Sequence, residues 1–133
     1  MLSKITKKTE SATQMLDVTG DIAEVVNQSN VKDGVLIVSS PHTTCGVTIN
    51  ENTDAGVQRD IHTALGILFP HGDSKYTHKG DNADAHIKTS LVGTSVIVLI
   101  EDGDLKLGRW QSVYLCEFDG PRDRTLMLKI LAG

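Results

Sequence analysis

The segment THKGDNADAH, from Thr77 to His86, gathers two histidines, two aspartates and an asparagine within a short stretch. No apolar side chain larger than alanine interrupts it. Neutral imidazole and carboxylate groups are the usual ligands of a divalent metal, and a helix that begins here would attract a phosphate. His78 and His86 are therefore candidate site residues, although a His-x7-His spacing across a loop is not diagnostic of a metal.

The same segment has an alternative interpretation, in which it only begins a helix. Asp81 would cap the helix and Asp84 would sit at its third position, a weak version of the capping box. Ala83, Ile87 and Leu91 would then form the buried stripe, because residues four apart share one helix face. This interpretation accounts for the aspartates but not for the two histidines, so both interpretations stay open.

A second stretch, PHTTCGVTINEN, places His42 directly after a proline that follows an apolar strand. Proline keeps the residue before it extended and gives the chain a sharp exit from the strand. A histidine at such a strand end commonly lines a cleft. The alternative is a loop histidine that is hydrogen-bonded to the backbone. His62 and His71 are expected at the surface.

The third stretch, LGRWQSVYLCEFDGPRDR, combines a cysteine, a glutamate and several arginines. Strand alternation puts Cys116 on one face with Tyr114, and Glu117 on the other. A lone cysteine is most often a small buried apolar group. Arg122 and Arg124 point to one side if a strand follows. They could then grip a phosphate bidentately, or they could be solvated charges at a sheet edge.

Hydrophobic periodicity divides the chain into strands and a few helices. Apolar runs predict strands over residues 2–8, 12–18, 34–40, 45–51, 94–100, 105–109, 111–117 and 123–132. Apolar residues three and four apart predict helices over 19–29, from caps at 52–54 to Pro70, and over 84–91. In the second helix the predicted apolar face is formed by Val57, Ile61, Ala64, Leu65 and Leu68.

Turn signals between these elements indicate how the strands are connected. The turn at 8–11 predicts a hairpin between the first two strands, and Asp102-Gly103 predicts another. The runs at 34–40 and 94–100 are almost continuously apolar, which is typical of strands buried on both faces. Consecutive strands without helical crossovers indicate mainly antiparallel sheets, in an α+β or sandwich arrangement with two to three short helices and not in a Rossmann fold.

Length and composition bound the class of protein. The 133 residues are enough for one domain, over residues 1–133, with a core of its own. A net charge of −4 gives no basic face for a nucleic acid. No apolar run approaches the ~20 residues of a membrane span. Cys45 and Cys116 do not form a CxxC pair, and a cytoplasmic protein with reduced thiols fits best, although counting does not exclude a disulfide between them.

The three quoted stretches, in this order and over nearly the whole chain, resemble the signature blocks of the YjbQ-like family, also known as secondary thiamine-phosphate synthase. The resemblance implies a compact α+β domain whose two packed sheets form a sandwich of jelly-roll type, and a homotrimer. It implies a polar pocket near a subunit boundary, built by His42, His78 and His86 with Asp84 nearby. The third block would add Cys116, Glu117 and Arg122 to the pocket.

The resemblance also implies a reaction, in which hydroxymethylpyrimidine diphosphate and a thiazole phosphate are joined and pyrophosphate is released. The substrate would be a small phosphorylated molecule, with Arg122 and Lys88 as its phosphate-binding residues. A divalent metal, Zn or Mg, would be held by the three histidines. The family pattern often reads His, any residue, an acid, Gly, Asn, whereas this chain has Gly80 before Asp81. No acidic role is therefore transferred to Asp81.

Two other functions compete with this reaction. The three histidines could hold the metal-bound water of a different enzyme, for example a hydrolase. The protein could also be a non-catalytic trimer that binds a small anion or metabolite, although a plain anion site would favour arginine and lysine over histidine.

Overall fold

The structure is a computed structural model that describes residues 2–133. Its helices are α1 (Thr19–Ser29), α2 (Ala55–Leu68) and α3 (Ala83–Val92). Its strands are β1 (Leu2–Lys8), β2 (Gln14–Asp17), β3 (Asp33–Ser39), β4 (Cys45–Glu51), β5 (Ser95–Glu101), β6 (Asp104–Lys106), β7 (Gln111–Glu117) and β8 (Asp123–Ala132). Each of these elements was expected, and only β2 and β6 are clearly shorter than predicted. In this part of the chain, no helix has both the length and the apolar character that a membrane crossing requires.

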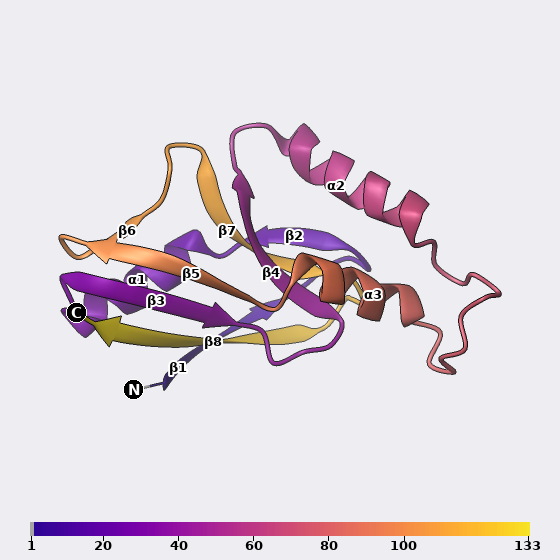
Figure 1. The fold of residues 1–133 in the computed structure, drawn as a ribbon, viewed down its shortest axis with the longest axis horizontal. Coiled ribbons are helices and arrows are strands. Elements are labelled where there is room, and N and C mark those ends of the chain that lie inside the picture. Colours follow the sequence, from indigo (N-terminus) through magenta and orange to yellow (C-terminus); the bar gives the residue numbers. More distant parts are fainter. Residues whose placement is uncertain (1) are drawn as a thin grey trace.

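The strands form two antiparallel sheets that pack against each other (Figure 1). The larger sheet has the strand order β1-β8-β3-β5-β6, and the smaller sheet has the order β2-β7-β4. The β5–β6 hairpin turns at Asp102 and Gly103, both with positive φ, as the sequence predicted. This arrangement confirms the predicted α+β fold with two mainly antiparallel sheets.

The predicted hairpin between the first two strands is wrong, because β1 and β2 lie in different sheets. β1 pairs with β8 and β2 pairs with β7. Between them Thr9 is buried, and its backbone N–H donates to the carbonyl of Arg122 at 2.9 Å. The N–H of Gly120 donates to the carbonyl of Ala12 at 3.0 Å. Residues 9–13 therefore cross from one sheet to the other beside the β7–β8 connection.

The main core lies between the two sheets and includes the inner face of α1. Ile22 and Val26, four residues apart on α1, are buried, as the periodicity predicted. The strands add Leu36, Val38, Val47, Val98, Ile100, Val113, Leu115, Leu126 and Leu128.

The outer face of the larger sheet is not covered in a single chain, which corrects the prediction that β3 and β5 are buried on both faces. Val98 and Ile100 of β5 point into the core, whereas Ile97 and Leu99 between them are 64% and 57% exposed. The difference arises because α1 and the smaller sheet lie on the same side of the larger sheet. The apolar runs are real, but within residues 2–133 the second face of β5 stays exposed, while Val35 and Ile37 of β3 are half-buried.

α2 begins at the predicted cap and ends before Pro70. The Asp54 Oδ1 accepts the backbone N–H of Gly56 at 2.8 Å. No residue of α2 is fully buried, and the helix stands clear of the strands in Figure 1. Of the predicted apolar face, Val57, Ile61 and Leu65 are half-buried while Ala64 and Leu68 are exposed.

α3 presents a different face to the protein from the one predicted. Its fully buried residues are Asp84, Ala85, Lys88 and Thr89, whereas Leu91 is 62% exposed. The helix-only interpretation predicted the reverse, because it assumed that the apolar residues mark the inner face. A buried ion pair between Asp84 and Lys88, with Nζ 3.0 Å from Oδ2, lets polar residues occupy that face instead.

A second, smaller cluster of apolar side chains lies on the outer face of the smaller sheet. Ala85 of α3 packs there with Tyr114, Cys116 and Phe118, and Leu65 of α2 packs against the same cluster. As predicted, Cys116 and Tyr114 share one face of β7, while Glu117 points to the other side.

Candidate functional site

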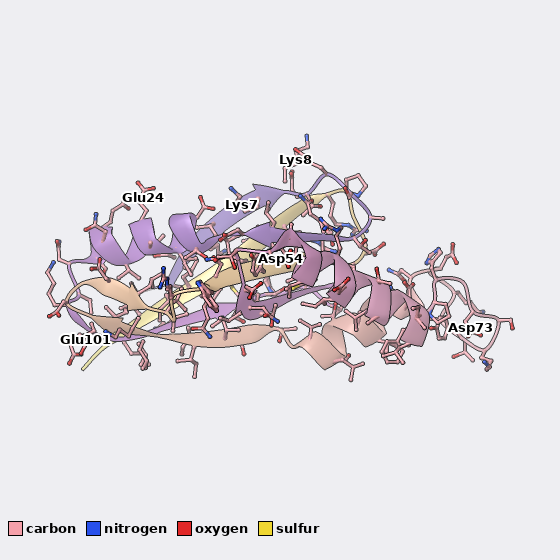
Figure 2. All side chains as sticks on the ribbon, turned by 90° about the horizontal axis from the view of Figure 1, so that it is seen from above. Lys7, Lys8, Glu24, Asp54, Asp73 and Glu101 are labelled. Carbon is pink, nitrogen blue, oxygen red and sulfur yellow. The ribbon has the colours of Figure 1, made fainter. Side chains whose placement is uncertain are left out.

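His78 and His86 lie together at the start of α3. Their ring centroids are 5.0 Å apart and the rings meet edge to face at 83°. They line a cavity of about 470 Å³ together with Lys75, Tyr76 and Ile87. The segment that carries this cavity lies at one end of the molecule, which Asp73 marks in Figure 2, opposite the end marked by Glu101.

Gly80 lies at the surface, close to the side chains of His78 and Asn82. A Cβ atom at this position would lie 2.6 Å from Nε2 of His78 and 2.9 Å from Oδ1 of Asn82. Such distances are shorter than van der Waals contact, so a larger residue would displace the His78 ring. A side chain at position 80 would therefore change the position of the His78 ring rather than strain the backbone.

Asp81 does not cap α3, which corrects the helix-only interpretation. Asp81 is exposed with φ +57°, and the residue that precedes the helix is Asn82. The side chain of Asn82 makes no capping bond and instead donates from Nδ2 to Oδ2 of Asp119 at 2.8 Å. Because a carboxylate only accepts, the amide oxygen of Asn82 must face the other way, where it is buried without a partner among residues 2–133.

The carboxylate of Asp84 contacts both His71 and Lys88. Its Oδ1 lies 3.0 Å from Nδ1 of His71, and its Oδ2 accepts from Nζ of Lys88 at 3.0 Å. Burial raises the pKa of Asp84, but the bonds from Lys88 and His71 outweigh it and hold the pKa below its ordinary value. The bond to Asp84 raises the pKa of His71. The ammonium of Lys88 is therefore engaged by Asp84, and its predicted role in binding phosphate stays a prediction.

His71 is exposed at its side chain, as predicted, yet it belongs to this charged group. Its side chain is 66% exposed, and its Nε2 lies 3.8 Å from Oδ2 of Asp81. Sequence reasoning missed this contact because His71 and Asp84 lie on either side of a segment without periodicity. Lys75 and Tyr76, which line the cavity, were missed for the same reason.

His42 occupies a different place, at the exit of β3 beside β8. Its Nε2 accepts the backbone N–H of Thr125 at 3.0 Å. Nε2 also lies 3.1 Å from the carbonyl oxygen of Thr125. Burial and, less strongly, the nearby Arg124 lower the pKa of His42. The alternative of a loop histidine bonded to the backbone describes this geometry.

Glu117 and Arg124 form a closed ion pair between the sheets. Their side chains are 0% and 3% exposed, and Nε of Arg124 donates to Oε1 of Glu117 at 2.9 Å. The Thr9 hydroxyl donates to the same carboxylate at 2.7 Å, and Arg124 donates to Oγ1 of Thr44 at 2.8 Å. Burial raises the pKa of Glu117, but Arg124 and Thr9 outweigh it and the pKa lies below its ordinary value. Arg124 is thus not a solvated edge charge.

The remaining predicted residues are spread over two other places. Arg122 is half exposed and is held by Asp119, with Nη2 3.1 Å from Oδ2. Cys116 and Cys45 are both free and buried, and burial raises the pKa of each thiol to about 12. Neither thiol is ionised at neutral pH, and such a thiol packs as a small apolar group.

The three histidines predicted to hold a metal do not converge within one chain. His78 and His86 are adjacent, while His42 is bound to the backbone of β8. Within residues 2–133, no three histidine, cysteine or acidic side chains are arranged to hold a metal ion. The metal site therefore stays a prediction.

Known proteins are similar to this chain in sequence and in fold. The family model described as UPF0047 protein YjbQ-like matches residues 3–133. A UPF0047 protein of Methanocaldococcus jannaschii is 45% identical over 131 residues, covering 98% of this chain and 94% of the relative. The UPF0047 protein YugU of Bacillus subtilis is 38% identical over 131 residues, covering 98% of this chain and 99% of the relative.

Solved structures are similar over almost the whole chain. A protein of the YjbQ/UPF0047 family from Clostridium acetobutylicum has a TM-score of 0.94 at 46% identity, covering 97% of this chain and 99% of its own. A hypothetical protein from Aeropyrum pernix has a TM-score of 0.94 at 35% identity, covering 100% of this chain and 99% of its own. None of these relatives is named for a reaction, so the function has to be argued from the site.

Proposed function

Because the chain belongs to the YjbQ-like UPF0047 family, we propose that it is an enzyme that acts on a small phosphorylated substrate in the His78–His86 cavity. The observation that carries the proposal is the pair of imidazole rings, 5.0 Å apart, in the wall of a cavity of about 470 Å³. This volume lies within the range of small-molecule sites. The start of α3 adds backbone N–H groups and a positive dipole end, which favour a phosphate.

The proposed reaction resembles that of thiamine-phosphate synthase. The nitrogen of the thiazole phosphate donates its electron pair to the methylene carbon of hydroxymethylpyrimidine diphosphate. The bond from that carbon to the diphosphate oxygen breaks, and its electron pair leaves with pyrophosphate. Negative charge therefore grows on the leaving group, and donors fixed near its oxygens would lower the barrier.

His78, His86 and Lys75 are the residues of this chain best suited to that task. The two imidazoles can donate hydrogen bonds or a proton to the departing oxygens. Lys75 lines the same cavity, and its partner Asp73 holds it only loosely at 3.6 Å. Lys88 and Arg122 would first have to leave Asp84 and Asp119, so Lys75 is the better phosphate contact.

The residues of one chain do not complete a metal site, although the family resemblance implies a divalent ion. His78 and His86 would supply two nitrogen ligands, and structural or catalytic zinc needs at least three from the protein. An ion at this pair would have to take further ligands from a second copy or from the diphosphate.

A homotrimer is the second part of the proposal. Its support is the apolar surface that one chain leaves uncovered, on β5 at Ile97 and Leu99 and on α2 at Ile67 and Leu68. These exposed apolar side chains, on two separate elements, could be buried between copies of the chain. Sedimentation velocity should give three times the mass of the chain, and Leu99→Lys should shift it toward monomer. A monomeric wild type would refute the trimer.

Turnover by the purified protein tests the reaction. The wild type is given both substrates, and thiamine phosphate is measured against His86→Ala. We expect the variant to be at least about 100-fold slower, as for loss of an acid–base group, with an unchanged thermal midpoint. Lys75→Ala should raise the KM for the diphosphate. A wild-type rate no higher than that of His86→Ala would refute the proposal.

The same preparation separates the two competing functions. Release of phosphate from the diphosphate substrate without a second substrate would favour the hydrolase. A rise in thermal stability on adding pyrophosphate, with no turnover, would favour the non-catalytic binding protein.

A further inference from the structure

The residue that precedes α3 is tied to the connection between two strands of different sheets. Nδ2 of Asn82 donates to Oδ2 of Asp119, 37 residues further along the chain, at 2.8 Å. Asp119 lies between β7 of the smaller sheet and β8 of the larger sheet. This bond therefore joins the start of the helix that carries His86 to the place where the chain passes from one sheet to the other.

Asp119 is itself held in place by its surroundings. Nη2 of Arg122 lies 3.1 Å from its Oδ2, and Nε of Arg122 donates to its backbone carbonyl at 2.8 Å. The next residue, Gly120, donates its N–H to the carbonyl of Ala12 at 3.0 Å, and a Cβ atom at Gly120 would collide with the carbonyl of Ser11. Because the connection packs so closely on the chain between β1 and β2, Asp119 is a fixed anchor.

The side chain of Asn82 is used in an unusual way for a residue that precedes a helix. An asparagine there ordinarily accepts a hydrogen bond from an N–H of the first turn, which stabilises the helix by about 1 kcal/mol. Within residues 2–133, the side chain of Asn82 makes no such bond and its amide oxygen has no partner. The amide therefore serves the bond to Asp119 and not the helix, so helix stability alone does not explain the arrangement.

Asn82 lies beside both imidazoles of the proposed site. Its backbone carbonyl accepts the N–H of Ala85 at 3.1 Å and that of His86 at 3.3 Å, so it sets where His86 leaves the first turn. Its Oδ1 and Nε2 of His78 lie 2.9 Å and 2.6 Å from the same point, which a Cβ atom at residue 80 would occupy. A shift of Asn82 would therefore displace the backbone of His86 and remove a neighbour of the His78 ring.

We infer that Asp119 is a positioning residue, whose bond to Asn82 holds the His78 and His86 rings in the arrangement that the site uses. The inference rests on the proposed function, because it takes these two rings as the site. Asp119 does not line the His78–His86 cavity, so it acts on a ligand only through Asn82. Side chains that meet a ligand need such supporting residues, because their own positions must be fixed before the ligand arrives.

The contact between the two rings gives a test that needs no substrate. In the wild type, the edge-to-face packing of His78 and His86 should give a nuclear Overhauser contact between their ring protons. This contact should be lost in Asp119→Ala. It should be kept in Asp119→Asn, because an asparagine still offers an oxygen to the amide of Asn82. The thermal midpoint should change little in both variants, since the ion pair with Asp119 is partly exposed.

Asn82→Ser separates a positioning role from a purely structural one. Serine is a good residue to precede a helix, but its side chain is too short to reach Asp119. The thermal midpoint should therefore stay the same or rise, while the contact between the two rings is lost. This variant keeps the test decisive if Asp119→Ala does not fold. A lower thermal midpoint with an intact ring contact would assign the bond to folding alone.

The affinity for pyrophosphate, measured by calorimetry, tests whether the bond matters to a ligand. Asp119→Ala and Asn82→Ser should each weaken binding about fivefold, the value of one net hydrogen bond. The double variant should also lose about fivefold and not about 25-fold, because both changes remove the same bond. The matched control is Glu101→Ala, which removes an exposed pair with Lys106 at the opposite end of the molecule (Figure 2) and should bind normally.

Several outcomes would overturn the positioning role. They are a ring contact that is absent from the wild type or survives in Asp119→Ala, losses of affinity that multiply in the double variant, and equal losses in Asp119→Asn and Asp119→Ala. The two proposals can fail separately. If the wild type binds no pyrophosphate, the proposed function fails and the ring contact still decides the role of Asp119. If the ring contact does not depend on Asp119, the positioning role fails and thiamine-phosphate synthesis is still measured directly.

Discussion

Residues 2–133 contain two buried ion pairs, and the surroundings of the two pairs differ. Glu117 and Arg124 lie between the sheets, where Thr9 and Thr44 satisfy the remaining groups. Asp84 and Lys88 lie on α3, where the third partner is the exposed His71. The Glu117–Arg124 pair is shielded from solvent and is called the closed network. The Asp84–Lys88 pair with His71 lies beside the exposed segment between α2 and α3 that carries the His78–His86 cavity, and this part is called the open region. The closed network can only hold the strands in place, whereas the open region lies beside side chains that a ligand can reach.

The largest expected effect concerns the closed network. Arg124→Met leaves the Glu117 carboxylate buried without its partner, which should lower the free energy of unfolding by about 3–5 kcal/mol. The matched control is Arg122→Met, which removes a half-exposed pair with Asp119 and should cost about 1 kcal/mol or less. Urea unfolding measures both. Similar losses of unfolding free energy in the two variants would show that the Glu117–Arg124 pair stabilises the fold no more than a surface pair does.

A second comparison sets one histidine from each region side by side. His86→Ala should reduce turnover about 100-fold with little change in stability. His42→Ala leaves the Thr125 N–H without its acceptor and should cost about 1–3 kcal/mol of stability. Assay and unfolding are measured on the same preparations. If His42→Ala is as inactive as His86→Ala and equally stable, His42 acts in the reaction and does not only hold β8 in place.

Gly80 offers a smaller, steric test of the open region. Gly80→Ala places a methyl group 2.6 Å from Nε2 of His78, so the ring must move. Gly80 and His78 are both exposed, so the ring can move without loss of the core. We expect roughly tenfold weaker binding of pyrophosphate, which is about 1.4 kcal/mol of binding free energy, with only a small change in thermal midpoint. Gly66→Ala on α2 is the control, because its Cβ would meet no neighbouring atom. Unchanged binding in Gly80→Ala would remove His78 from the site.

Acid should weaken the closed network in a defined direction. The pKa of Glu117 is held below its ordinary value of 4.5 in the folded protein. Its contribution is therefore fully present above the unfolded pKa and is lost as the pH falls through the folded pKa. In the wild type, the free energy of unfolding should fall between pH 6 and pH 3. In Glu117→Gln the part of this fall that is due to Glu117 should be absent. Identical slopes in the two proteins would contradict the assignment.

The open region should respond weakly and with the opposite sign. His71 has a raised pKa in the folded protein, so its contribution is present below the unfolded value of about 6.5 and is lost as the pH rises through the folded pKa. An NMR titration should place the midpoint of His71 above 6.5, and Asp84→Asn should lower it. A midpoint that does not respond to Asp84→Asn would show that His71 does not interact with Asp84.

Local sequence patterns predicted the elements well and their partners less well. The strand at 45–51 and the strand at 111–117 have the expected bounds, because their apolar side chains follow one period. The turn between the first two strands wrongly predicts a hairpin, because it gives no sign that Thr9 is buried against Glu117. Pairing between distant strands leaves no trace in a local pattern.

The candidate site shows the same limit. The sequence singled out His78 and His86, because no folding role explains two histidines in one polar segment. It did not reveal His71 or Lys75, which reach the site only through the path of the chain between α2 and α3. It also grouped His42 with them by resemblance, although the structure of one chain separates it.

The position of β8 has a consequence for the order of synthesis. β8 pairs with β1 on one side and with β3 on the other, so the earliest strand to be made joins the sheet through one made much later. A nascent chain that has not yet released Asp123–Ala132 from the ribosome cannot complete the larger sheet. Arg124, which anchors Glu117, arrives with the same strand. The larger sheet is therefore completed only once β8 has emerged, and until then one edge of β3 lacks its neighbour.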